Sequence, residues 1–275
     1  MRSIANLINC RDPDLLKLPK DFMDASVGSG RWQILVTLML SFITFIHLLN
    51  TGNETLLRPP GWWCKMPDFI AGWTDVQWIL YSHYKDSYKR ACSNGTILSS
   101  LWLSSSTFGR IGGYMVFGTL SDWVGRKSVI FIACGATPMT ALLVASSSDY
   151  TIFVVASIVH GFFHGGFAVS MILVLEISTN SWRTGLMAIS CGSFALGIGL
   201  TPVISGVFDS YDQMIVFINL LCVVMFVSSR FLPESPAWLF CTRDAKSLAK
   251  TIRTAAEVNQ RQLSAQYHDK VRGKS

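Results

Sequence analysis

The chain has 275 residues, of which 50% are hydrophobic and only 15% are charged. Soluble globular domains carry about 25% charged residues, so this composition argues against a water-soluble protein. The formal net charge is +6, but the basic residues do not cluster in one polar domain, which argues against a nucleic-acid-binding protein.

Six apolar runs follow one another along the chain. Each is close to the ~20 residues that cross a bilayer core as a helix. A buried helix of a soluble protein could explain a single run, but the sequence lacks the polar helices that would cover such a core. We therefore predict an all-α, polytopic membrane protein with a six-helix transmembrane bundle over residues 32–232, and runs at 32–51, 98–118, 128–147, 151–175, 184–207 and 213–232.

The charges predict how this bundle is oriented. If both chain ends face the cytoplasm, most Lys and Arg residues lie on the inner side, as the positive-inside rule requires. This orientation gives a cytoplasmic N-terminal segment 1–31, an extracellular loop 51–97 and a cytoplasmic tail 233–275. Because the first run follows a polar segment, it is expected to be a retained signal anchor. In the tail, residues 243–258 have the spacing of an amphipathic helix, either lying on the membrane surface or solvated.

The extracellular loop holds the candidate covalent modifications. Cys64 and Cys92 both lie there, and they are candidates for a disulfide, whereas Cys241 faces the reducing cytoplasm. Asn53 and Asn94 begin glycosylation sequons. Each sequon lies near a predicted helix end, where the bilayer hinders modification.

Small residues are dense in the fourth and fifth runs. Glycine lets helix backbones approach closely in a membrane, where association depends on packing. A packing role is therefore expected for Gly161, Gly165 and Gly166 in the fourth run and for Gly185, Gly192, Gly197, Gly199 and Gly206 in the fifth.

The turn between the second and third runs reads GTLSDWVGRK and covers residues 118–127. Gly125 permits a tight reversal of the chain. Asp122 is expected to accept hydrogen bonds from free N–H groups at the start of the third helix and to pair with Arg126. An ordinary topology anchor would explain Arg126 and Lys127, but neither Asp122 nor the glycine spacing.

Three motifs on the predicted cytoplasmic side resemble the major facilitator superfamily. The turn 118–127 resembles the signature between helices 2 and 3 of that superfamily. Glu176 and Arg183 resemble the glutamate and arginine of the corresponding loop after helix 4, and LPESPAWL at 232–239 resembles the Pro-Glu-Ser-Pro-Arg motif after helix 6. Sugar porters share all three motifs, so other features must indicate the subfamily.

Further motifs resemble the organic cation and anion transporter family, over most of this chain but only over the amino-terminal half of such a transporter. They are GRWQ at 30–33, His47, WWC at 62–64, GFFHGG at 161–166 and AAEVNQ at 255–260. The sequence departs from the family pattern at Ala237 and at Ser157, two positions where relatives carry arginine. The arginine missing at Ser157 is the one associated with proton coupling in related carriers, so the resemblance does not imply such coupling.

The resemblance implies alternating access, in which two six-helix bundles rock about a central site in a plasma membrane. It implies no cofactor, and the expected partners are the lipid bilayer, a small organic ion, and either a carboxy-terminal half or a second copy. A charge network on the inner side would stabilise the outward-open state. Its expected members are Gly118, Asp122, Gly125, Arg126, Lys127, Glu176, Arg183 and Glu234.

Candidate substrate-facing residues lie within the runs. Arg110 is in the middle of the second run, where a charge usually faces a cavity or a partner. His160 and His164 share a helix face, which suits a proton relay, although packing histidines are the simpler interpretation. No carboxylate or cysteine accompanies them in sequence, so no metal is expected. His47 and Phe163 could add aromatic walls for a flat organic ion.

Two hypotheses for the function follow. The first is transport of small organic ions by a partial or truncated carrier. The second is a membrane module that binds a ligand or regulates a full-length carrier without transporting, and a sugar-porter-type facilitator is a further alternative. No Ser-His-Asp arrangement or phosphate loop is present, so we do not expect an enzyme.

Overall fold

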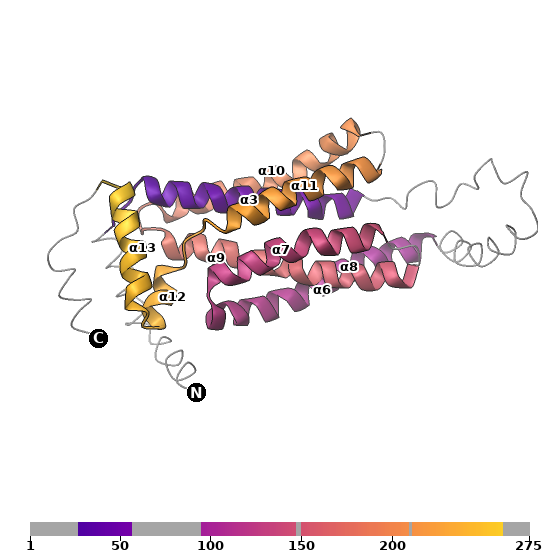
Figure 1. The fold of residues 1–275 in the computed structure, drawn as a ribbon. Helices are drawn as coiled ribbons and strands as arrows, with labels where there is room; N and C mark the ends of the chain where they lie inside the picture. Colours follow the sequence, from indigo (N-terminus) through magenta and orange to yellow (C-terminus); the bar gives the residue numbers. More distant parts are fainter. Residues whose placement is uncertain (1–26, 57–94, 147–149, 209–210, 261–275) are drawn as a thin grey trace, which may run out of the picture.

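The computed structural model describes residues 27–56, 95–146, 150–208 and 211–260. These residues form a bundle of long helices with two short helices at one end (Figure 1). The predicted all-helical class is confirmed, because the described residues contain no strand. The elements are α3 (Arg31–Leu56), α6 (Gly95–Val124), α7 (Arg126–Ala145), α8 (Tyr150–His164), η2 (Gly165–Phe167), α9 (Ala168–Ile177), α10 (Arg183–Val207), α11 (Tyr211–Ser229), α12 (Pro236–Cys241) and α13 (Ala245–Val258).

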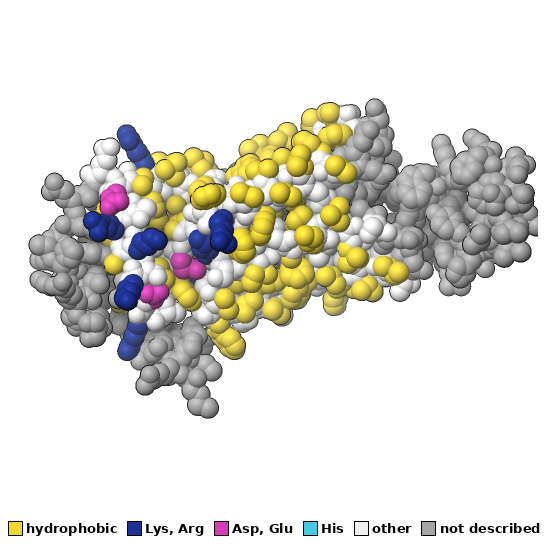
Figure 2. All heavy atoms as spheres, viewed as in Figure 1, with side chains coloured by type: hydrophobic (Ala, Val, Ile, Leu, Met, Phe, Trp, Pro, Cys, Tyr) yellow, Lys and Arg dark blue, Asp and Glu magenta, His cyan; other side chains and the backbone are white. Residues whose placement is uncertain are grey.

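The surface of the bundle matches a lipid environment. Four helical segments are long and apolar enough to cross a membrane, and they are Arg31–Asn50, Arg126–Val144, Thr151–Ile177 and Arg183–Ile204. Large apolar side chains such as Met115 and Val207 are more than 70% exposed. On the face shown in Figure 2 the charged side chains gather near one end of the molecule, and hydrophobic side chains cover most of the rest of the described residues. We call this end, which carries α12 and α13, the charged end.

The helices pack in a pattern that repeats between the two halves of the chain. The closest pairs are α6 with α8 and α10 with α3, followed by α11 with α7. The helices α3, α6 and α7 correspond, in this order, to α8–α9, α10 and α11. When each helix is replaced by its counterpart, the α6–α8 pair becomes the α10–α3 pair and the α11–α7 pair stays the same. Such equivalence is typical of transporter bundles built from two structural repeats.

Glycine sets the closeness of the α6–α8 pair. A Cβ atom at Gly109 or Gly113 would overlap the α8 backbone, and one at Gly161 would overlap the backbone of Ser106. The predicted packing role is confirmed for Gly161, Gly165, Gly166 and Gly197.

Three glycines of the fifth run do not pack against another helix of the described residues. A Cβ atom at Gly185, Gly192 or Gly199 would meet no described atom within 4 Å, and the surroundings of Gly206 fall outside what the structure describes. These glycines are seven residues apart, so they share one exposed face of α10, directed away from α3.

The amphipathic helix predicted in the tail is present as α13, and it lies across the charged end (Figure 1). Its apolar face packs on protein, with Ile252, Ala255 and Ala256 fully or almost fully buried. It therefore covers the base of α3 and α12, an arrangement that neither predicted alternative described. Hydrogen bonds from Ser247 to the Asp244 carboxyl cap the helix and lower the pKa of that carboxyl.

Candidate functional site

The junction between α6 and α7 is a single glycine. Gly125 has φ 103° and ψ 155°, a conformation that is essentially restricted to glycine. A Cβ atom at this position would lie 2.5 Å from Oε2 of Glu234. The glycine therefore provides both the chain reversal and the space for a carboxylate from a distant segment.

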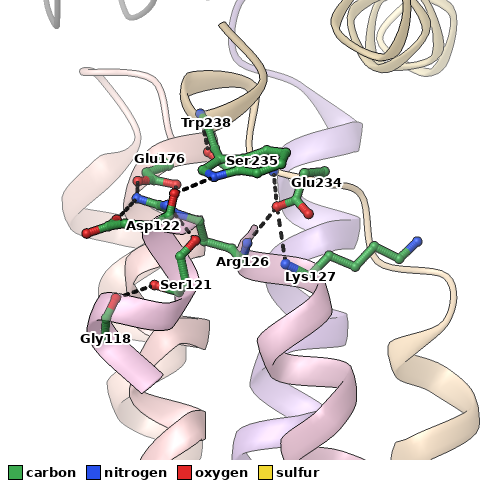
Figure 3. Close-up of polar contacts among 9 residues, drawn as sticks. All are labelled: Gly118, Ser121, Asp122, Arg126, Lys127, Glu176, Glu234, Ser235 and Trp238. Carbon is green, nitrogen blue, oxygen red and sulfur yellow. Dashed lines mark hydrogen bonds and ion pairs between the residues drawn. The ribbon is translucent and has the colours of Figure 1, made fainter. Parts of the chain in front are cut away.

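Arg126, the first residue of α7, gathers carboxylates from two helices (Figure 3). Its Nε and Nη2 donate to the two Glu176 carboxylate oxygens at 3.1 and 3.0 Å, in a bidentate pair. Nη2 also lies 2.9 Å from Oδ1 of Asp122, and Nη1 donates to the Ser121 carbonyl at 2.9 Å. The Arg126 and Glu176 side chains are only 12% and 17% exposed, whereas Asp122 is 51% exposed. The Glu176 pair is thus the stronger one, because solvent screens it less.

Glu234 binds the start of α7. Its Oε1 accepts from the backbone N–H groups of Arg126 at 2.8 Å, Lys127 at 3.2 Å and Ser235 at 3.0 Å. A carboxylate is favourable here because the first N–H groups of a helix have no intrahelical partner. The role predicted for Asp122 at these N–H groups is therefore wrong. The last turn of α6 continues to Val124, which leaves Asp122 on the helix surface beside the Arg126 side chain.

The Trp238 indole completes the connection. Its Nε1 donates to the carbonyl of Asp122 at 2.9 Å, near the end of α6. The α6–α7 junction is therefore linked to α9 through Glu176 and to the segment before α12 through Glu234. We call Asp122, Arg126, Glu176 and Glu234 the charge cluster.

The structure does not bring together every predicted member of the network. The side chain of Lys127 extends away from the carboxylates (Figure 3). Gly118 contributes its carbonyl to Ser121 at 2.8 Å, and a Cβ atom there would meet nothing within 4 Å. Arg183 stands apart from the charge cluster, and its buried Nε and Nη2 atoms have no hydrogen-bond partner within the described residues.

A second polar assembly at the charged end was missed in the sequence. The Asn259 side chain accepts from the Trp32 backbone at 2.8 Å and donates to the Val27 carbonyl at 3.2 Å and the Gln33 side chain at 3.1 Å. Its amide fills the space where Gly30 would carry a Cβ atom. We call these contacts the Asn259 clamp. They join GRWQ to AAEVNQ. Both motifs resemble the same transporter family, and this shared resemblance was the sequence feature that could have indicated a contact between them.

Helix α3 also carries a buried polar stripe that the sequence analysis did not identify. Its members are Gln33, Thr37, Ser41, Thr44, His47 and Asn50, all at most 7% exposed. The sequence feature that indicates this stripe is the recurrence of polar residues every three or four positions in an apolar run. In the C-terminal half of α3, the His47 ring stacks on the Phe167 ring. The centroid of the His47 ring lies 3.8 Å from that of Phe167 and 4.3 Å from that of His164.

The predicted substrate-facing residues divide into two groups. His47, His160 and His164 meet in the bundle interior, and Arg110 interacts electrostatically with His47 and His164. Phe163 instead packs with Phe117 and Phe162 between α6 and α8. Contact with a substrate stays a prediction for all five.

The predicted covalent sites lie mostly beyond the structure. Cys64, Cys92 and Asn94 fall outside the described residues, and Asn53 is in α3 but its side chain is not described. Cys241, expected to be reduced, is disulfide-bonded in the structure.

Comparisons with known proteins agree with this architecture. Residues 68–273 match the Sugar (and other) transporter family. Mouse solute carrier family 22 member 3 is 25% identical over 229 residues, which make up 82% of this chain and 41% of that protein. Human organic cation/carnitine transporter 2 is 26% identical over 195 residues, 69% of this chain and 34% of that protein. The crystal structure of the human organic anion transporter MFSD10 (TETRAN) has a similar fold, with a TM-score of 0.51 and 18% identity over 74% of this chain and 48% of that chain.

These matches indicate the family of the chain and cover only part of each relative. It spans less than half the length of the relatives it matches, 41% and 34% in the two curated cases. The family match covers most of the chain, and the resemblance to organic cation and anion transporters of the major facilitator superfamily is confirmed. The chain therefore belongs to the Sugar (and other) transporter family, whose members are multi-pass membrane transporters and not enzymes.

Proposed function

We propose that the chain is the amino-terminal six-span half of an alternating-access carrier for small organic ions in a plasma membrane. The six spans are α3, α6, α7, α8 with α9, α10 and α11. The repeated pairing of helices supports this assignment, as does the length of α6, 30 residues, and of α11, 19 residues. The relatives named for organic cations and organic anions support the substrate class.

The observation that carries the mechanism is the charge cluster. Arg126 and Glu234 hold the α6–α7 junction, α9 and the segment before α12 together at one end of the bundle. Charge-assisted hydrogen bonds contribute about 1.5–3 kcal/mol each, and a gap of a few kcal/mol separates the states of a two-state protein. The contacts of the charge cluster are thus strong enough to stabilise the outward-open state and weak enough to break when the inner side opens.

Two further features support a partner bundle, either a carboxy-terminal half or a second copy. The buried Nε and Nη2 atoms of Arg183 call for an acceptor, and a carboxylate of the partner would supply one. The face of α10 with Gly185, Gly192 and Gly199 is exposed here, and glycine faces allow another helix to approach closely.

Transport by the chain alone is the first test. Vesicles that contain only this polypeptide are assayed for uptake of labelled organic cations and anions, with empty vesicles as the control. Saturable uptake supports a carrier made of two copies. Activity that appears only after addition of a separate carboxy-terminal half supports a partial carrier.

The alternative is a module that binds a ligand or regulates a full-length carrier. It predicts ligand binding, or a changed flux through a co-expressed relative, without uptake in either vesicle experiment. A sugar-porter-type facilitator would instead take up labelled hexoses and not organic ions.

The charge cluster is tested in a complete carrier assembled with a carboxy-terminal half. Neutralising Asp122 and Arg126 together should change the transport kinetics while the protein remains in the membrane. Unchanged surface expression and unchanged kinetics would contradict the proposed gate.

A further inference from the structure

Two basic side chains lie where the ends of α7 and α11 meet the charged end. Lys127 is the second residue of α7, and Arg230 directly follows α11. The two helices pack against each other. The guanidinium carbon of Arg230 lies 5.8 Å from the centroid of the Phe131 ring, which is one helical turn from Lys127 on the same face of α7. We call Lys127, Phe131 and Arg230 the basic edge.

Below the basic edge, aromatic side chains fill the contact between the two helices. The ring centroids of Phe131 and Phe226 are 4.7 Å apart. Phe226 also lies against Gly135, where a Cβ atom would approach its ring to 2.9 Å. Phe226 and Arg230 are four residues apart on the α11 side, so they share a face as Lys127 and Phe131 do. The two basic side chains therefore stand at the end of an apolar contact between helices.

The basic edge has no acidic partner among the described residues. The Lys127 side chain extends away from the carboxylates of the charge cluster (Figure 3), and Oε1 of Glu234 contacts the Lys127 backbone nitrogen. The carboxylates described at the charged end are engaged elsewhere: Asp122 and Glu176 pair with Arg126, Glu234 binds backbone N–H groups, Asp244 caps α13 and Glu257 pairs with Arg253. An anion from outside the chain would offset the two neighbouring positive charges.

Next to the basic edge, α11 presents an apolar face to the lipid. Leu220, Val223 and Val227 are at least 50% exposed, and Phe231, beside Arg230, is 73% exposed. These residues recur every three or four positions and therefore lie on one side. On the face shown in Figure 2, basic side chains border the hydrophobic side chains. A ligand with a negative headgroup and long apolar chains matches both parts of this surface.

We propose that the basic edge binds the headgroup of an anionic phospholipid, with the acyl chains along the exposed face of α11. The positive-inside rule assigns the charged end to the inner leaflet, which holds the anionic lipids. Basic sites between transmembrane helices on this side bind such headgroups in other membrane proteins. The lipid would link the start of α7, beside Arg126, to the segment that carries Glu234. Its binding does not depend on transport.

Native mass spectrometry of the purified chain in detergent tests the proposal, with dioleoylphosphatidylserine as the probe. We expect the chain to retain this lipid with an affinity about tenfold higher than that for dioleoylphosphatidylcholine, which has the same acyl chains and phosphate but no net charge. Millimolar inorganic phosphate should not displace the lipid, because a free anion makes no contact with the apolar face of α11. This competition distinguishes a lipid site from a phosphate site.

Variants assign the lipid to the basic edge. The double variant with Lys127→Gln and Arg230→Gln should bind phosphatidylserine about thirtyfold more weakly, since each basic residue near a membrane surface contributes about fivefold. The matched control combines Lys246→Gln with Lys250→Gln, which removes the same charge from exposed positions of α13. The control should bind as the wild type does. Lys127→Arg with Arg230→Lys keeps both charges and should retain most of the affinity.

Photocrosslinking locates the acyl chains. Phosphatidylserine with a diazirine in one acyl chain should label α11 between Leu220 and Phe231 in the wild-type chain, and labelling confined to other helices would overturn the proposal. Equal affinity for the two lipids, displacement by phosphate, or an equal loss of affinity in the α13 control would overturn it as well. Lipid selectivity, competition and labelling use the wild-type chain, so they decide the matter even if the double variant does not fold. None of these measurements involves flux, so the proposed transport function is tested separately.

Discussion

At the scale of single residues, the charge cluster depends on one backbone conformation. Gly125 adopts φ 103° and ψ 155° where Glu234 approaches the start of α7. The nearby Gly118 belongs to the same sequence motif, but it lies within α6 and has no neighbour in the way of a Cβ atom. Of the two motif glycines, Gly125 is thus the one that its backbone conformation and its described neighbours require to be glycine.

Alanine substitution should affect the two glycines in opposite directions. Gly125→Ala should lower the free energy of unfolding by about 1–3 kcal/mol, because the backbone is strained and Glu234 is displaced. Gly118→Ala should raise it by about 0.5–1 kcal/mol, since alanine favours a helix interior. Thermal unfolding of both purified variants checks this. Equal effects of the same sign would contradict the assigned role of Gly125.

The two carboxylates that bind Arg126 should differ in importance. Glu176→Gln should destabilise the protein by about 1.5–3 kcal/mol, because a partly buried bidentate pair is lost. Asp122→Asn should lower stability by less than about 1 kcal/mol, since the Asp122 side chain is 51% exposed and screened by solvent.

Denaturation at low and at 1 M salt measures both variants. High salt should remove most of the Asp122 effect and little of the Glu176 effect. A larger effect of Asp122→Asn at low salt would show that the bidentate pair is not the main contact of Arg126.

At the scale of elements, the Asn259 clamp fastens α13 to the base of α3. The segment before α3 is also held on its other side, where the Ser29 hydroxyl lies 2.6 Å from the Thr179 hydroxyl. Thr179 lies between α9 and α10, close in sequence to Glu176 of the charge cluster. Movement of α3, α9 or α13 should therefore disturb the other two elements.

Asn259→Ala should release α13. The backbone N–H of Trp32 and the carbonyl of Val27 lose their partner, so the α13 amides should exchange hydrogen for deuterium at least tenfold faster, as expected for a loss of about 1.4 kcal/mol. Arg253→Ala is the control, because Arg253 is 77% exposed and pairs only with Glu257 on the same helix. Equal protection of α13 in both variants would show that the apolar face alone holds the helix.

At the scale of the whole molecule, the polar and apolar surfaces are separated along the bundle axis. On the face shown in Figure 2 the charged side chains lie near the end with α12 and α13, and the remaining described residues are largely apolar. A membrane therefore surrounds the long helices, with the charge cluster and the Asn259 clamp outside its apolar core.

The orientation gives a prediction for intact cells. An epitope tag inserted beside Asp75 should bind antibody without permeabilisation, because the positive-inside rule places that segment outside. A tag after Ser275 should bind only after permeabilisation. Exposure of the second tag in intact cells would reverse or break the six-span topology.

Local composition alone predicts the helices and the position of the charged turn. Apolar runs of about 20 residues form helices wherever backbone polar groups cannot reach water, and this condition depends only on local composition. The chain reversal at Gly125 and the pairing of Asp122 with Arg126 four residues later are local for the same reason.

Which distant groups meet depends on how the helices pack in three dimensions. Glu234 and not Asp122 binds the start of α7, across 108 residues of chain, and Asn259 binds Trp32 across 227 residues. The meeting of His47 with His164 also requires the end of α8 to lie close to α3. Each polar group is satisfied by whichever partner the packed helices bring within about 3 Å, and a one-dimensional pattern does not contain that geometry.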